Sequence, residues 1–103
     1  MQPIGYGYLV VRSSLTRQDR EARKAALSTY AEDEGYTLAL IFEEIEGSTD
    51  ALSAVIGLAR DGRASVLIGA LSDLGMTPRI QARALCRIKD ETGTQVLILD
   101  PMS

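Results

Sequence analysis

Two short polar segments of this 103-residue chain carry the side chains best suited to chemistry, and each follows an apolar stretch. The first segment is Arg12, Ser13 and Ser14, and the second contains Ser72 and Asp73. A serine hydroxyl becomes a nucleophile when a neighbouring group activates it, and a guanidinium holds phosphate oxygens in a fixed geometry. These residue types therefore suggest a site for a small anion or phosphate, provided that the fold brings the two segments together.

The apolar pattern predicts the elements that position these segments. Strands are expected over residues 6–11, 36–45, 64–71 and 95–99. Helices are expected to begin at Thr16, after the 46–50 loop and at Thr77-Pro78, and to end at Gly35, Gly62 and Gly93. Threonine caps and glycines in a left-handed conformation are typical of such ends, and we expect Gly62 to adopt that conformation.

Two of these elements have a distinctive apolar pattern. The first helix is expected to pack through small residues, with an apolar face of Ala22, Ala25, Ala26, Leu27, Tyr30 and Ala31. In the second strand, Leu38, Leu40 and Phe42 occupy alternate positions. Because side chains alternate between the faces of a strand, this spacing places the three on one face.

Strands that alternate with helices of ten or more residues imply right-handed crossovers and a parallel sheet covered on both faces. We therefore expect a single three-layer α/β domain over residues 1–103, of flavodoxin-like type, with a mainly parallel four-stranded sheet in the order 2-1-3-4. Ligands of such sheets bind beyond the carboxyl ends of the strands, near the switch point between the first and third strands. Both polar segments fall there.

Composition limits the classes of partner. A net charge of −3 and a pI near 4.8 argue against unaided DNA binding, because phosphate affinity requires a surplus of Lys and Arg. Three arginines nevertheless share one face of the third predicted helix: Arg79, Arg83 and Arg87. This face is either simply solvated or used for interaction. No apolar run approaches the roughly 20 residues of a membrane span. With no histidine and only Cys86, we expect a cytoplasmic protein without metal or cofactor.

The motifs of the chain occur in a recognisable order. Gly7-Tyr8 opens the first strand, a helix ends at Gly35, an acidic loop contains Gly47-Ser48, and Leu71, Leu74 and Gly75 form a turn after the third strand. This arrangement resembles the catalytic domain of the resolvase/invertase-type serine recombinases over nearly the whole chain. The resemblance implies a site-specific DNA recombinase, in which a serine forms a covalent link to DNA and arginines hold the scissile phosphate.

The chain departs from that family at the reactive positions. Aligned without a gap, Arg12 falls where the family has its nucleophilic serine, and Val10 falls where it has its first arginine. Asp73 and Met76 replace the two arginines of the phosphate clamp. A guanidinium cannot form the covalent link, so the resemblance implies a degenerate active site. The chain also contains no counterpart of the family's dimerisation helix or DNA-binding module.

Three hypotheses follow. The leading one is a catalytically inactive serine-recombinase-like domain that serves as an interaction or regulatory module, with a protein partner or second copy bound through the third helix or an exposed sheet edge. The second is a divergent recombinase fragment that exchanges strands with a longer partner and uses Ser13 or Ser14, brought into place by a bulge, as nucleophile. The third is a domain that binds a small anion or phosphate with these serines and the first helix N-terminus. DNA is expected to bind weakly or through a partner, and no membrane is involved.

Other polar residues have simpler interpretations. Glu43, Glu44 and Glu46 are expected to form a solvated run, because consecutive strand positions point to opposite faces. Cys86 is expected to be a small packing residue of the third helix.

Overall fold

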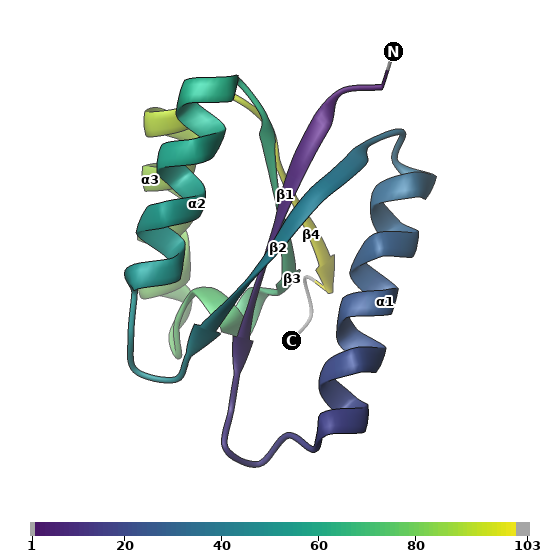
Figure 1. Ribbon diagram of the computed structural model, residues 1–103. Coiled ribbons are helices and arrows are strands. Elements are labelled where there is room, and N and C mark those ends of the chain that lie inside the picture. The colour runs from purple at the N-terminus through teal and green to yellow at the C-terminus, as the bar shows by residue number, and fades with distance from the viewer. Residues whose placement is uncertain (1, 101–103) are drawn as a thin grey trace.

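Four strands form one parallel sheet in the order β2-β1-β3-β4, which confirms the expected topology (Figure 1). The structure, a computed structural model, describes residues 2–100. Its strands are β1 (Ile4–Val11), β2 (Thr37–Ile45), β3 (Ser65–Ala70) and β4 (Val96–Asp100). Its helices are α1 (Arg17–Asp33), α2 (Asp50–Gly62) and α3 (Pro78–Thr92), and a short 3-10 helix, η1 (Leu71–Leu74), follows β3.

Helices cover both faces of the sheet, with α1 on one face and α2 and α3 on the other (Figure 1). The larger core lies under α2 and α3, where Val55, Ile68 and Ile88 are fully buried. The smaller core, under α1, contains Leu9 and Leu67. Burying each such side chain stabilises the fold by about 1.5–3 kcal/mol. Within residues 2–100, no helix combines the length and hydrophobicity that crossing a membrane requires.

The helix ends follow the expected caps with one exception. Thr16 forms a capping box with Asp19, and Thr77 accepts a hydrogen bond from an amide of the first turn of α3. The left-handed residue after α2 is Arg63, with φ 52° and ψ 40°, so the expectation for Gly62 was wrong. The helix runs one residue further because the turn at Arg63 lets the amide of Ala64 donate to a carbonyl of the last turn as β3 begins.

The apolar residues of β2 do not share one face as their spacing predicts. Leu38 packs in the core under α1, whereas Phe42 packs in the core under α2 and α3. The cause is an irregular register with β1, in which Leu38 pairs with Gly5 and Leu40 pairs with Tyr6. One extra residue of β2 is accommodated there, and such a shift reverses the face of every following side chain.

The anchoring of α1 is narrower than its sequence predicts. Only Leu27 and Ala31 of this helix are buried, and the expected apolar positions Ala22, Ala25 and Ala26 are exposed. Ala26 lines a hollow with Leu9 and Leu99 instead of packing against the sheet, and partly buried Tyr30 packs in the same core as Leu27 and Ala31. Leu27 is the largest fully buried side chain of α1.

Replacing Leu27 with alanine should destabilise the protein by about 2–5 kcal/mol, because it leaves a cavity between α1 and the sheet. The exposed position gives a matched control, since Ala22→Ser should change stability by less than about 0.5 kcal/mol. Urea denaturation followed by circular dichroism measures both values. Equal effects of the two substitutions would contradict this packing.

Candidate functional site

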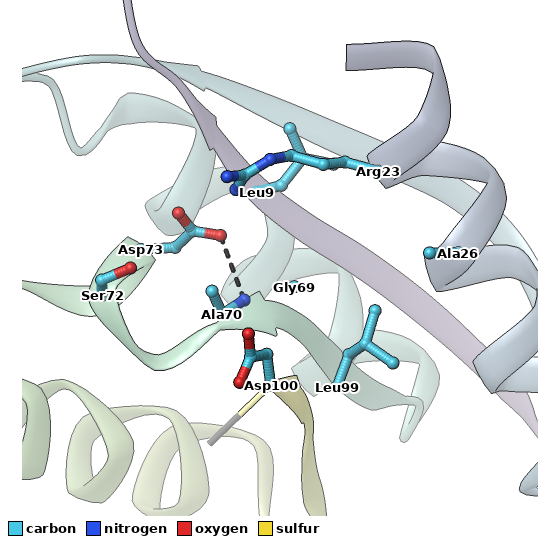
Figure 2. Close-up of a pocket in the computed structure, with 9 residues that line it drawn as sticks. All are labelled: Leu9, Arg23, Ala26, Gly69, Ala70, Ser72, Asp73, Leu99 and Asp100. Carbon is cyan, nitrogen blue, oxygen red and sulfur yellow. Dashed lines mark hydrogen bonds between the residues drawn. The ribbon is translucent and has the colours of Figure 1, made fainter. Parts of the chain in front are cut away.

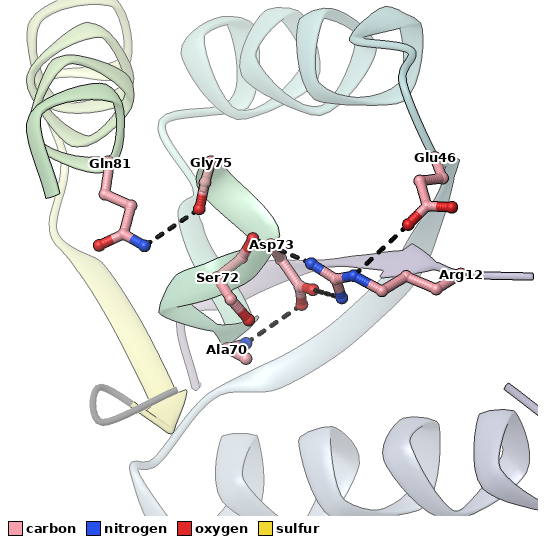
Figure 3. A network of polar contacts seen from close by, with 7 residues as sticks. All are labelled: Arg12, Glu46, Ala70, Ser72, Asp73, Gly75 and Gln81. Atoms are coloured by element: carbon pink, nitrogen blue, oxygen red, sulfur yellow. Dashed lines mark hydrogen bonds and ion pairs between the residues drawn. The ribbon is translucent and has the colours of Figure 1, made fainter. Parts of the chain in front are cut away.

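The two polar segments meet at the carboxyl edge of the sheet, as predicted from the strand order (Figure 3). Because β1 and β3 are parallel neighbours, the residues that follow them emerge side by side. Arg12 Nη1 lies 3.3 Å from Asp73 Oδ1, and Arg12 Nη2 donates a hydrogen bond of 3.1 Å to the carbonyl of Ser72. Arg12 Nε lies 3.7 Å from a carboxylate oxygen of Glu46. The guanidinium therefore faces carboxylates and a carbonyl of its own chain.

Asp73 is buried at this junction. Its side chain has 0% of its surface exposed, and its Oδ2 accepts a hydrogen bond of 3.2 Å from the amide of Ala70. Burial raises the pKa of Asp73 above its usual value, and the hydrogen bond and charge of Arg12 offset this only in part. Asp73 therefore both holds the start of η1 and supplies a counter-charge to Arg12.

This arrangement reverses the charges that phosphate chemistry requires. The resemblance implies a serine at the position of Arg12 and an arginine at the position of Asp73. The observed guanidinium and carboxylate instead bind each other across the strands. A phosphate here would have to displace a buried carboxylate and would face its negative charge. The geometry is that of a closed ion pair, not of an open anion clamp.

Within residues 2–100, Ser13 and Ser14 form no hydrogen bond with this junction. Both are exposed in the turn after β1, and Ser13 lines a hollow of about 630 Å³ to which Arg12 and Glu46 also contribute. The first helix is capped by Thr16 and not by either serine. The carboxylate of Asp19 already accepts a hydrogen bond from the amide of Thr16, which adds negative charge where the third hypothesis would place an anion.

Glu44 is a structural residue that the sequence analysis missed. It is 3% exposed, so the expectation of a solvated acidic run was wrong for this residue. Its carboxylate accepts hydrogen bonds of 3.0 Å from the amides of Ala51 and Leu52 and one of 3.2 Å from the Tyr8 hydroxyl. The signal in the sequence was its spacing, because Glu44 occupies the same face of β2 as Phe42 and shortly precedes the start of α2.

The electrostatics of Glu44 follow from these contacts. Burial alone would raise the pKa of Glu44, but hydrogen bonds from the amides and from Tyr8 outweigh it and lower the pKa below 4.5. Burial, together with the nearby Glu44 charge, raises the pKa of the Tyr8 hydroxyl. Glu44 is therefore ionised at neutral pH, where it complements the positive end of the α2 dipole.

A second hollow, of about 270 Å³, opens on the α1 side of the same junction (Figure 2). Leu9 and Leu99 form its apolar wall, while Asp73 and Asp100 supply carboxylates. Arg23 extends into it from α1, and its charge acts on Asp73. Two acids and one guanidinium leave the described lining without the surplus of positive charge that a phosphate site needs.

The arginines of α3 differ in their surroundings. Arg87 Nε lies 2.8 Å from Glu91, and Arg87 Nη2 donates a hydrogen bond to the Ser53 hydroxyl of α2. Arg79 and Arg83 are exposed, and no described residue forms an ion pair with either. On the predicted helix face, Arg79 and Arg83 therefore carry charges that form no ion pair within residues 2–100. Arg87, the third arginine of that face, ties α3 to α2.

Cys86 also lies on α3 but does not pack as expected. Its side chain is exposed, because the inward face of α3 passes through Ala84, Leu85 and Ile88 instead. The thiol is available for labelling.

Replacing Glu44 with glutamine should lower stability at pH 7 by about 1–3 kcal/mol, because hydrogen bonds to an ionised carboxylate are lost. The pKa of Glu44 is lower in the folded state than in the unfolded chain, so its contribution is present above pH 4.5 and disappears as pH falls through the folded value. The free energies of unfolding of wild type and variant should therefore converge in acid. A constant difference from pH 7 to pH 3 would contradict this role.

Replacing Arg12 with glutamine should destabilise the protein by about 1–3 kcal/mol at pH 7, since the Asp73 carboxylate stays buried without its counter-charge. The pKa of Asp73 is already raised, and losing Arg12 raises it further, so the penalty should grow as pH rises and shrink in acid. The double variant Arg12→Gln/Asp73→Asn should recover part of the loss. A thermodynamic cycle of the four proteins measures the coupling, and strictly additive effects would rule out the pair.

The comparisons with known proteins identify no relative from which a function of this site could be inferred. No family model matches the sequence, and no curated protein is significantly similar to it.

Proposed function

We propose that this chain is a catalytically inactive, serine-recombinase-like domain that acts by binding another macromolecule. The observation that carries the proposal is the pairing of Arg12 with the buried Asp73 at a distance of 3.3 Å. These two residues occupy the positions at which the resemblance implies a nucleophile and a clamp arginine.

The charge distribution supports a loss of catalysis. A transferring phosphate requires preorganised cations, and losing one such group commonly costs a factor of about 10²–10³ in rate. At the junction, Arg12 is engaged by Asp73, Ser72 and Glu46. Separating it would leave a buried carboxylate unpaired. The same contacts that stabilise the strand ends therefore oppose phosphate binding.

Surface chemistry favours a protein partner over DNA. The net charge of −3 opposes a close approach to a phosphate backbone. Large apolar side chains are exposed at several places, including Ile45 at 77%, Met76 at 95% and Ile80 at 50%. Met76 and Ile80 line the same hollow, and contiguous exposed apolar surface marks a protein interface. A binding role uses this surface and needs no nucleophile.

Incubation with supercoiled plasmid should leave the plasmid intact and form no phosphoserine adduct detectable by mass spectrometry. Fluorescence polarisation with a labelled duplex should show at most weak binding that disappears between low and moderate salt, because only surface charge is involved. A nicking endonuclease confirms that the plasmid can be cleaved.

Cleavage that disappears in the Ser13→Ala/Ser14→Ala double variant would overturn the proposal and support the divergent recombinase. Background cleavage that persists in the double variant would come from a contaminating nuclease. The variant is a fair control because both serines are exposed and their loss should leave folding unchanged.

A further inference from the structure

A continuous groove lies between the start of α2 and α3, the two helices that cover one face of the sheet (Figure 1). It consists of a larger hollow of about 650 Å³ and a smaller one of about 340 Å³. The hollows are continuous because Thr49, Leu52, Leu74 and Ile80 line both of them. The larger hollow opens at the carboxyl edge of the sheet, and the smaller one extends along α3 as far as Arg87.

The floor of this groove is apolar. Val10, Leu52 and Leu74 lie there, and none of them has more than 8% of its surface exposed. The Tyr8 hydroxyl at the floor already donates a hydrogen bond to Glu44. An apolar side chain that enters the groove therefore covers carbon surface without separating that hydroxyl from its partner.

Exposed apolar side chains form one rim of the groove. Met76 is 95% exposed and Ile80 is 50% exposed. Ile80 is held in place, because Gly75 packs so closely against it that a side chain at position 75 would collide with it. Gln81 donates a hydrogen bond of 3.0 Å to the carbonyl of Gly75 (Figure 3), and Thr77 accepts one of 3.2 Å from the amide of Ile80. The rim is therefore pre-formed, which lowers the entropic cost of binding.

The two ends of the groove differ in charge. At the sheet end, Arg12 forms ion pairs with Glu46 and Asp73. At the other end, the described lining holds Arg83 and Arg87 without an acidic residue. A ligand that lies along the groove therefore meets acids at one end and guanidinium groups at the other.

Arg83 is available to such a ligand. Its side chain is exposed, and it forms no ion pair within residues 2–100. Thr49, which lines the same hollow, forms no side-chain hydrogen bond with the start of α2. A guanidinium and a hydroxyl in this state can both donate to a carboxylate, and such charge-assisted hydrogen bonds are the stronger ones.

We propose that the groove binds a short segment of another protein that combines a bulky apolar side chain with an acidic residue. The apolar side chain covers Leu52, Leu74 and Ile80, and the carboxylate pairs with Arg83. This fixes the direction of the segment, because its acidic end must lie away from the acids at the carboxyl edge of the sheet. A nucleic acid fits less well, since its phosphates would face those acids. This inference names the partner of the proposed binding role and rests on it.

Selection from random peptides of about 12 residues displayed on phage, which as helices span about 18 Å, tests the chemistry of the occupant. Wild type should enrich peptides that carry an apolar residue near Asp or Glu. Arg83→Glu should instead enrich peptides with Lys or Arg there, because the substitution reverses the charge at that end of the groove. Arg17→Glu makes the same change in net charge at an exposed position of α1, on the opposite face of the sheet. This control should select the acidic peptides.

Fluorescence polarisation with the peptide most enriched on wild type gives the affinities. Arg83→Glu should weaken binding at least about tenfold, since attraction becomes repulsion. Met76→Ser should weaken it at least about threefold, because apolar contact at the rim is lost. Arg17→Glu should bind within about twofold of wild type. All three positions are exposed, so these variants should fold like wild type, as judged by circular dichroism.

No enrichment on wild type, the same peptides on wild type and Arg83→Glu, or equal affinities of all variants would each overturn the inference. Arg83-dependent binding of a labelled duplex, or self-association that Arg83→Glu abolishes in sedimentation equilibrium, would assign the groove to DNA or to a second copy and would overturn it as well. The proposed function fails on a different result, the serine-dependent cleavage of plasmid DNA. A chain that selects no peptide and cleaves no DNA would therefore remove this inference and leave the loss of catalysis in place.

Discussion

The Glu44 carboxylate joins three elements that are far apart along the chain. It lies near the end of β2 and accepts hydrogen bonds from the Tyr8 hydroxyl of β1 and from two amides in the first turn of α2. These contacts fix where α2 begins above the sheet, and the buried residues of α2 then complete the larger core. A buried charge is tolerated because every contact is directed at its ionised form. The position of α2, and of the core beneath it, depends on this interaction.

The Arg12–Asp73 pair has a different role. It connects the ends of the two central strands and converts a place where ligands commonly bind into a contact within the chain. Asp73 also accepts a hydrogen bond from the amide of Ala70, so the ion pair is linked to the short helix η1. At the place where ligands of such sheets commonly bind, the charged side chains are therefore engaged with each other and stabilise the fold.

Sequence patterns predict the architecture because it depends on periodicity that many residues share. The alternation of strands and helices, the strand order and the caps at Thr16 and Gly93 all follow from such patterns. The meeting of Arg12 with Ser72 and Asp73 was also predictable, since the ends of neighbouring parallel strands coincide.

The errors arise where one residue breaks a pattern. An irregular register near Leu38 reverses the faces of β2, and the alternation of Leu38, Leu40 and Phe42 does not indicate it. Ala26 is exposed because it lines a hollow with Leu9 and Leu99. The burial of Glu44 was masked by its acidic neighbours, although its face was the apolar one. Such features depend on tertiary contacts, which local sequence patterns do not contain.

The narrow attachment of α1 has a consequence for the motions of the molecule. The two faces of the sheet are covered unequally, with two helices over the larger core and one helix over the other. Local opening requires the least free energy where the fewest apolar contacts break, so α1 can detach while the sheet and its opposite layer stay folded. Amide protons of α1 would then exchange with solvent by a partial unfolding step, and those of β3 only when the whole domain unfolds. The molecule would behave as two cooperative units, although its chain forms a single sheet.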